Sequence, residues 1–102
     1  MERTVLVVIA TLTGKPDKRA EIDAALSTAA AASRTETGCL SYSFCRDLED
    51  ADRYISVETW VDQAALDAHF GTPHLAELLG KAPDLLVGAP DIKTYETADP
   101  TG

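Results

Sequence analysis

Two histidines and one glutamate lie close together in the second half of the chain, and their side chains could move protons. His69 and His74 are the only histidines in the sequence. Histidine accepts or donates a proton near neutral pH, so either residue could act as a base or a proton relay. Glu58 precedes them on an apolar strand, where a buried carboxylate needs a partner. We therefore predict catalytic roles for His69 and His74, with Glu58 orienting one of the two rings.

Both histidines also have ordinary structural explanations. Since His69 falls on the apolar face of a predicted helix, it could be a core residue bonded to a backbone carbonyl or to Glu58. His74 follows Pro73 in the first turn of a second predicted helix, a position typical of a surface or capping residue. Residue types and spacing alone leave these alternatives open.

The same glutamate and histidines could form a carboxylate–histidine metal site. However, the spacing H-E-x-x-H is absent, and Cys39 and Cys45 do not have the spacing of zinc ligands. The sequence also contains no glycine-rich phosphate loop for a nucleotide and no G-x-S-x-G serine motif. We therefore predict that the protein uses neither a metal nor an organic cofactor.

Aromatic side chains near the histidines could hold a flat substrate. Trp60 and Phe70 flank the predicted helix that carries the first histidine, and Tyr42, Phe44 and Tyr54 lie on the two strands predicted before it. An apolar cleft lined by such rings would bind an aromatic compound and exclude water. We predict that these five residues contact the substrate. The alternative is that they fill the hydrophobic core.

The local pattern around these residues predicts a strand followed by two short helices. Residues 54–60 are rich in β-branched and aromatic types, as strands are. Asp62 can cap the first turn of a helix, and Gly71 is a typical helix end. Thr72 can cap the next helix, with Pro73 at its first position. This unit would bring the tryptophan and both histidines to one end of a strand.

The rest of the chain completes an α+β pattern. We predict strands over residues 4–13, 39–48 and 91–96, a helix over 20–36, and a loop that begins at residues 81–84. The resulting order, β-α-β-β-α-β, is the ferredoxin-like split βαβ arrangement.

Two cysteines lie on the second predicted strand. At ~3.3 Å per residue, the Cα atoms of Cys39 and Cys45 would be ~20 Å apart, too far for a disulfide. Two free thiols are typical of the reducing cytoplasm, where we place the protein. Ser41 and Ser43 share a strand face with them, and these small residues could lie under a helix or line a cavity.

Length and charge limit the possible partners. A chain of 102 residues fits one domain, with a core over about residues 4–96 and a loose tail over 97–102. The net charge of −8 disfavours nucleic acid and anionic membranes. The apolar run near the start is short, and Lys15 and Pro16 follow it in place of a small-residue cleavage site. We therefore predict a buried strand there and no membrane span.

A longer pattern resembles a known family. Glu58-x-Trp60, Ala65-Leu66, Ala68-His69 and Thr72-Pro73-His74 are similar to the signature of the antibiotic biosynthesis monooxygenase domain family, and the resemblance extends over roughly residues 5–96. That family includes quinol monooxygenases and the anthrone oxygenases of aromatic polyketide pathways.

The resemblance implies an assembly and an activity. It implies a homodimer in which two sheets face each other as a dimeric α/β barrel. It also implies oxidation of a small electron-rich aromatic, such as a quinol, phenol or anthrone, by O₂ without flavin, haem or metal. Haem-degrading relatives carry an asparagine on the first strand, whereas residues 4–13 contain none.

Two other functions fit the same fold and pocket. One is an isomerase, or an aldehyde-processing enzyme, that acts on a small metabolite and needs the same base in a dry cleft. The other is a dimeric small-molecule binding protein without turnover, since a fold does not determine a function. The sequence does not separate these alternatives from the oxygenase, and it does not name the substrate.

Overall fold

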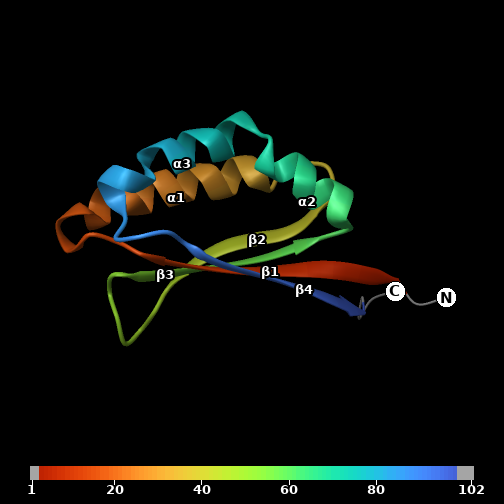
Figure 1. Cartoon of the computed structure of the whole chain (residues 1–102), viewed down its shortest axis with the longest axis horizontal. Helices are drawn as coiled ribbons and strands as arrows, with labels where there is room; N and C mark the ends of the chain where they lie inside the picture. The colour runs from red at the N-terminus through yellow and green to blue at the C-terminus, as the bar shows by residue number, and fades with distance from the viewer. Residues whose placement is uncertain (1–2, 99–102) are drawn as a thin grey trace.

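A computed structural model describes residues 3–98 and contains a single sheet with helices on one of its faces (Figure 1). Among these described residues, no helix has both the length and the apolarity needed to cross a membrane. The elements follow one another as β1 (Thr4–Thr13), the short 3-10 helix η1 (Pro16–Lys18), α1 (Arg19–Ser33), β2 (Cys39–Arg46), β3 (Arg53–Trp60), α2 (Gln63–Phe70), α3 (Pro73–Leu85) and β4 (Asp91–Ala98).

The four strands form an antiparallel sheet in the order β2-β3-β1-β4. This topology confirms the predicted ferredoxin-like α+β fold. The register aligns Tyr42, Glu58, Val8 and Thr94 across the four strands. Because directly paired residues point to the same face of an antiparallel sheet, these four side chains share the face that the helices cover.

The core lies between this face and the helices. Along β1, Leu6 and Val8 are buried whereas the intervening Val7 is only half-buried, as expected for a strand with one covered face. One core cluster surrounds the fully buried Trp60, and a second surrounds Ile22 of α1. The candidate catalytic region belongs to the first cluster.

The opposite face of the sheet is also partly apolar. Val7 and Ile9 of β1 lie there, paired with Tyr95 of β4 and Val57 of β3. Val57 is 41% exposed and Tyr95 is 49% exposed, so this chain alone leaves apolar side chains in contact with water. The expectation that a second copy covers this face stays a prediction.

The prediction of a loop at residues 81–84 is wrong, because α3 continues through Pro83 to Leu85. Proline removes a helix N–H and normally disfavours a helix interior. Here the end of α3 is held by Lys15, whose backbone N–H donates to the Leu85 carbonyl (2.8 Å) and whose Nζ donates to the Pro83 carbonyl (3.1 Å). Leu85 is buried in the core, so tertiary packing outweighs the local helix breaker.

Three other boundaries differ from the prediction. Helix α1 ends at Ser33, whose hydroxyl donates to the Ala29 carbonyl, so residue 36 lies in the turn that follows. Strand β2 ends at Arg46 rather than at residue 48. Strand β4 continues to Ala98, into the predicted tail, and residues 99–102 of that tail lie outside the described residues.

The small residues of β2 lie on the face that the helices leave open. Ser41 and Ser43 are exposed, whereas Tyr42 is buried and Phe44 half-buried on the helix side. Of the two predicted alternatives, the position under a helix is wrong for Ser41 and Ser43, because the bulky rings occupy that side. A register shift between Cys39 and Ser41 interrupts the alternation and leaves the first cysteine half-buried.

The turn between α1 and β2 requires glycine. Gly38 has a φ of +89°, and a Cβ there would lie 2.5 Å from Cβ of Ala65 and 2.9 Å from Cγ2 of Val61.

We expect Gly38→Ala to lower the free energy of unfolding by about 1–3 kcal/mol, measured by urea denaturation. The matched control is Gly80→Ala, in α3, where a Cβ meets nothing within 4 Å. The free energy of unfolding of that variant should rise by about 0.5–1 kcal/mol. Equal effects at both glycines would contradict this account of the turn.

Candidate active site

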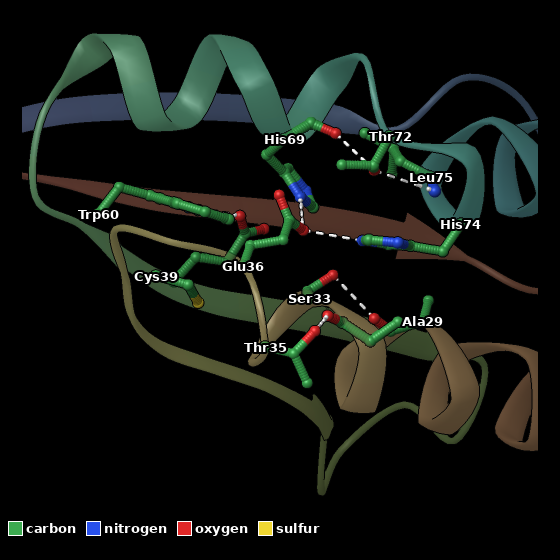
Figure 2. A network of polar contacts seen from close by, with 12 residues as sticks. Ala29, Ser33, Thr35, Glu36, Cys39, Trp60, His69, Thr72, His74 and Leu75 are labelled. Carbon is green, nitrogen blue, oxygen red and sulfur yellow. Dashed lines mark hydrogen bonds and ion pairs between the residues drawn. The ribbon is translucent and has the colours of Figure 1, made fainter.

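Both histidines contact the same carboxylate oxygen, which belongs to Glu36. Oε2 of Glu36 lies 2.7 Å from Nδ1 of His69 and 2.8 Å from Nε2 of His74 (Figure 2). The side chains are 12%, 2% and 23% exposed for Glu36, His69 and His74, respectively. These distances are typical of charge-assisted hydrogen bonds, in which each imidazole N–H donates to the ionised carboxylate.

Three elements bring these side chains together. His69 lies in the last turn of α2. Asp62 caps the start of this helix as predicted, because its carboxylate accepts from the Ala65 N–H (2.9 Å). His74 lies in the first turn of α3, which Thr72 caps as predicted. The Thr72 hydroxyl also donates to the His69 carbonyl (2.7 Å), so one residue links the end of α2 to the start of α3 and sets the separation of the two rings.

Glu36 lies in the α1–β2 turn, two residues before Gly38. Its backbone N–H donates to the Ser33 carbonyl (3.1 Å), and its own carbonyl accepts from the Cys39 N–H (3.1 Å). These two bonds hold the turn in place. No local sequence pattern points to Glu36, because its partners follow 33 and 38 positions later. The long-range packing of the turn against α2 and α3 creates the contact.

Glu58, the carboxylate predicted to orient a histidine, has different partners in the structure. It is 4% exposed, accepts a bond from the Ser56 hydroxyl (2.8 Å) and accepts another from the Trp60 indole N–H (3.0 Å). Residues two apart on a strand point to the same side, which explains this choice. The carboxylate that contacts the histidines is Glu36, which the sequence did not indicate.

A cavity of about 60 Å³ lies between the sheet and the helices α2 and α3. His69, Glu58, Ser56 and Tyr42 supply its polar atoms. The remaining lining is apolar, so the cavity combines one imidazole and one carboxylate with otherwise apolar walls. Its apolar members are Val8, Ala10, Leu12, Phe44, Phe70, Leu75, Leu78, Leu79, Pro90 and Ile92.

The predicted substrate-contacting residues divide between several places. Tyr42, Phe44 and Phe70 line the cavity. Trp60 is fully buried in the first core cluster and packs against the His69 ring, with 4.6 Å between ring centroids. Tyr54 belongs to the second core cluster and lines a separate groove of about 380 Å³ between α1 and β2.

The two histidines also differ in position. His69 lines the cavity, whereas His74 lines a different hollow of about 30 Å³ between α1 and α3. The His69 ring is surrounded by aromatic neighbours, since the Tyr42 and Phe70 centroids lie 5.5 and 5.7 Å from it. The structure thus brings both histidines together through Glu36 but places only His69 at the cavity.

Comparison with known proteins identifies the family. The sequence profile described as antibiotic biosynthesis monooxygenase matches residues 5–79, from β1 into α3. The chain belongs to the antibiotic biosynthesis monooxygenase family. The match covers Glu36, Glu58 and both histidines, so the site lies within the part of the chain that defines this family.

Several members of the family are similar over most of this chain. "Uncharacterized protein sll1783" of Synechocystis sp. is 42% identical over 94 residues, which cover 92% of this chain but only 64% of that protein, so this chain spans less than two thirds of its length. "Putative monooxygenase YcnE" of Bacillus subtilis is 26% identical over 93% of this chain and 100% of its own. "Putative monooxygenase Rv0793" of Mycobacterium tuberculosis is 31% identical over 79% of each chain.

Solved structures show the same fold. The structure of Rv0793 superposes with a TM-score of 0.87 at 26% identity, covering 96% of this chain and 99% of that one. The structure of the "Putative antibiotic biosynthesis monooxygenase from Nitrosomonas europaea" has a TM-score of 0.92 at 20% identity, and the match covers 100% of this chain and 98% of that one. At 20% identity, the similarity to the Nitrosomonas europaea structure shows the fold alone.

The histidine pair in this family member also has the chemistry of a metal site. Glu36, His69 and His74 offer one oxygen and two nitrogens, all within 4.8 Å of one another. Two imidazoles and one carboxylate are a donor set that suits first-row transition metals. These three residues would therefore be the ones to hold an ion.

Tyr42 gives the site a pH-dependent stability. Burial and then the neighbouring Glu58 carboxylate raise the pKa of Tyr42 above its usual value. Below pH ~10 both folded and unfolded chains keep the phenol proton, whereas above it the unfolded chain loses the proton first. The free energy of unfolding should therefore fall as pH rises through about 10.

Urea denaturation at pH 8 and pH 10.5 checks this expectation. Tyr42→Phe should show a smaller loss of stability between the two pH values than the wild type. The control is Tyr95→Phe, at a half-exposed position on β4, which should behave like the wild type. An equal loss in wild type and Tyr42→Phe would show that the phenol does not cause the decline.

Proposed function

We propose that this protein is a cofactor-independent monooxygenase that oxidises a small electron-rich aromatic compound with O₂. The observation that carries the proposal is the position of His69. Its ring is 2% exposed, lines a largely apolar cavity, and has one nitrogen bonded to a carboxylate. A base fixed in this way, beside a dry binding cavity, is the minimum that such a reaction needs from the protein.

The chemistry can proceed without a bound cofactor because the substrate supplies the electrons. His69 would remove a proton from a quinol, phenol or anthrone, and the resulting anion would transfer an electron to O₂. One oxygen atom then enters the product and the other leaves as water. Tyr42, Phe44 and Phe70 would contact the ring, and the apolar wall would keep water from the anion.

The cavity must widen to admit such a ring. Its volume of about 60 Å³ is well below the ~300 Å³ of common ligand pockets. Phe70 and Leu79 line it and are 49% and 50% exposed, so few contacts hold these two side chains in place. Their displacement is the most direct way to enlarge the cavity.

The active form that we propose is a homodimer in the cytoplasm. The apolar strand residues opposite the helices, among them Val57 and Tyr95, are the surface that a second copy would cover. The relatives share the family and the fold, and dimers are common in this family. The two cysteines are both free in the structure, which agrees with a reducing compartment.

Oxygen uptake tests the proposed activity. Purified protein would be mixed with a panel of quinols, phenols and anthrones, with absorption spectra recorded to detect flavin or haem. We expect uptake above the autoxidation rate of at least one compound. If a folded protein gives none with the whole panel, the isomerase and the binding-protein alternatives become the better explanations.

Removal of metal should leave the activity unchanged. The two nitrogens of the histidine pair lie at hydrogen-bond distance from Glu36, an arrangement that is stable with protons alone. We therefore expect protein dialysed against a chelator to keep its full rate, with the metal content checked by elemental analysis. Loss of activity on chelation, restored by one added transition metal, would show that the trio holds a catalytic ion instead.

A further inference from the structure

We propose that Glu36 and His74 are positioning residues that fix the tautomer and the orientation of the His69 ring for the reaction. The inference rests on the proposed function, in which His69 is the base. It assigns unequal roles to the two histidines: His69 exchanges a proton with the substrate, and His74 acts only through Glu36.

Both imidazole rings share a single carboxylate oxygen. Nδ1 of His69 and Nε2 of His74 lie 2.7 and 2.8 Å from Oε2 of Glu36. An ionised carboxylate only accepts hydrogen bonds, so the ring nitrogen facing it must carry a proton. His69 is then held as the tautomer with hydrogen on Nδ1 and a lone pair on Nε2, and Nε2 is the atom that we assign to the substrate.

In the proposed proton transfer, Nε2 of His69 accepts the proton of the substrate. The substrate O–H or C–H bond breaks and its electron pair stays on the substrate, while the proton forms a new N–H bond at Nε2. His69 becomes an imidazolium whose other N–H points at the Glu36 carboxylate, so the new positive charge forms 2.7 Å from a negative one. This is the arrangement in which a carboxylate supports a histidine base in a catalytic triad.

His74 contributes the second hydrogen bond to the same oxygen. This bond stabilises the negative charge of Glu36 and fixes the direction of its carboxylate. The His74 ring lines a different hollow, together with Ala29, Glu77 and Lys81. It is not among the residues that line the substrate cavity, so we assign it the orientation of the carboxylate and no contact with the reacting atoms.

Glu58, the carboxylate that lines the cavity, does not offer a competing assignment. Glu58 already accepts from Ser56 and from Trp60 at 2.8 and 3.0 Å. Tyr42, the remaining polar ring at the cavity, is kept protonated, because burial raises the pKa of its phenol. Glu58 is therefore bonded to its strand neighbours, and Glu36 is the carboxylate that bonds the imidazole.

The tautomer of His69 can be measured without any substrate. Because the chain has two histidines, ¹⁵N NMR of histidine-labelled protein gives a simple spectrum, which His74→Ala assigns. We expect His69 to show a protonated Nδ1 and an unprotonated Nε2. Glu36→Ala should shift His69 toward the other tautomer. Glu77→Gln, an exposed glutamate in the same hollow as His74, is the matched control and should change nothing.

A double-mutant cycle tests whether His74 acts through Glu36. Glu36→Ala should lower kcat at least about 10-fold, in line with the loss of a group that orients a base. His74→Ala should lower kcat several-fold in the wild type but by less than about twofold in the Glu36→Ala background. If Glu36→Ala does not fold, Glu36→Gln, which keeps the shape and loses the charge, replaces it in both experiments.

Two results would overturn the inference. The first is a His69 tautomer that is the same with and without Glu36. The second is a His74→Ala effect of equal size in both backgrounds, which would make His74 an independent base. If the protein consumes no oxygen with any substrate, the proposed function fails, but the NMR experiment still decides whether Glu36 sets the state of His69.

Discussion

His69→Ala is expected to reduce substrate-dependent oxygen uptake by about 10²–10⁴-fold, the range lost when a positioned proton-transfer group is removed. The reason is that His69 supplies the only imidazole among the lining residues of the cavity. Neither Tyr42 nor Glu58 can easily replace it, since the pKa of Tyr42 is raised by burial and Glu58 already accepts two hydrogen bonds. The measurement is kcat with an established substrate at saturating concentration.

The fold of the variant must be checked because His69 is buried. Its removal leaves space beside Trp60, whose ring centroid lies 4.6 Å from that of His69. His69→Gln keeps a polar side chain in that space and should lose activity to a similar extent. Far-ultraviolet circular dichroism and thermal melting would confirm that both variants are folded. A folded His69→Ala protein with more than about a tenth of the wild-type rate would exclude His69 as the base.

Trp60→Ala is expected to lower the free energy of unfolding by about 3–5 kcal/mol. Trp60 is 0% exposed and lies at the centre of the core cluster that also contains Val8, Tyr42 and Leu66. The substitution removes the indole from this cluster and also removes the N–H that bonds to the buried Glu58. Urea denaturation monitored by circular dichroism would measure the loss.

Trp60→Phe separates the two parts of this effect. Phenylalanine keeps an aromatic ring but cannot donate to Glu58, so one oxygen of a carboxylate that is 4% exposed loses a partner. We expect a loss of about 1–3 kcal/mol from the missing hydrogen bond, smaller than that of the alanine variant. If both substitutions cost less than about 1 kcal/mol, the core assignment of Trp60 is wrong.

Local signals were sufficient to predict much of the fold. Asp62 and Thr72 cap their helices as expected, because a cap is a contact between residues only three positions apart. The strand at residues 4–13 and the ferredoxin-like order also agree with the sequence pattern. These features depend on periodicity and on neighbours in the chain, which a single sequence displays directly.

Features that depend on distant contacts were missed. Pro83 was expected to end a helix, but bonds from Lys15 hold that helix end, and these two residues are 68 positions apart. The face of β2 that carries Ser41 was expected either to lie under a helix or to line a cavity, but Tyr42 pairs with Glu58 on the helix side instead. Packing across the sheet decides which face of the sheet a given strand residue points to.

The same distinction applies to the candidate site. Both histidines could be selected from their residue type and position, and the structure brings them within hydrogen-bond distance of one carboxylate. The identity of that carboxylate could not be predicted: Glu58 was the nearer choice in sequence, but its strand neighbours Ser56 and Trp60 bind it. Glu36 reaches the histidines only because the turn before β2 packs against α2 and α3.

The source of the inserted oxygen tests the central proposal most directly. The chelator-treated protein would react with a quinol or anthrone that supports oxygen uptake under ¹⁸O₂, and the product mass would be determined. We predict one ¹⁸O atom in each product molecule, in amounts above the uncatalysed control, with the enhancement absent for His69→Ala. Product without ¹⁸O, or equal incorporation with wild type and His69→Ala, would contradict a monooxygenase that uses His69 as its base.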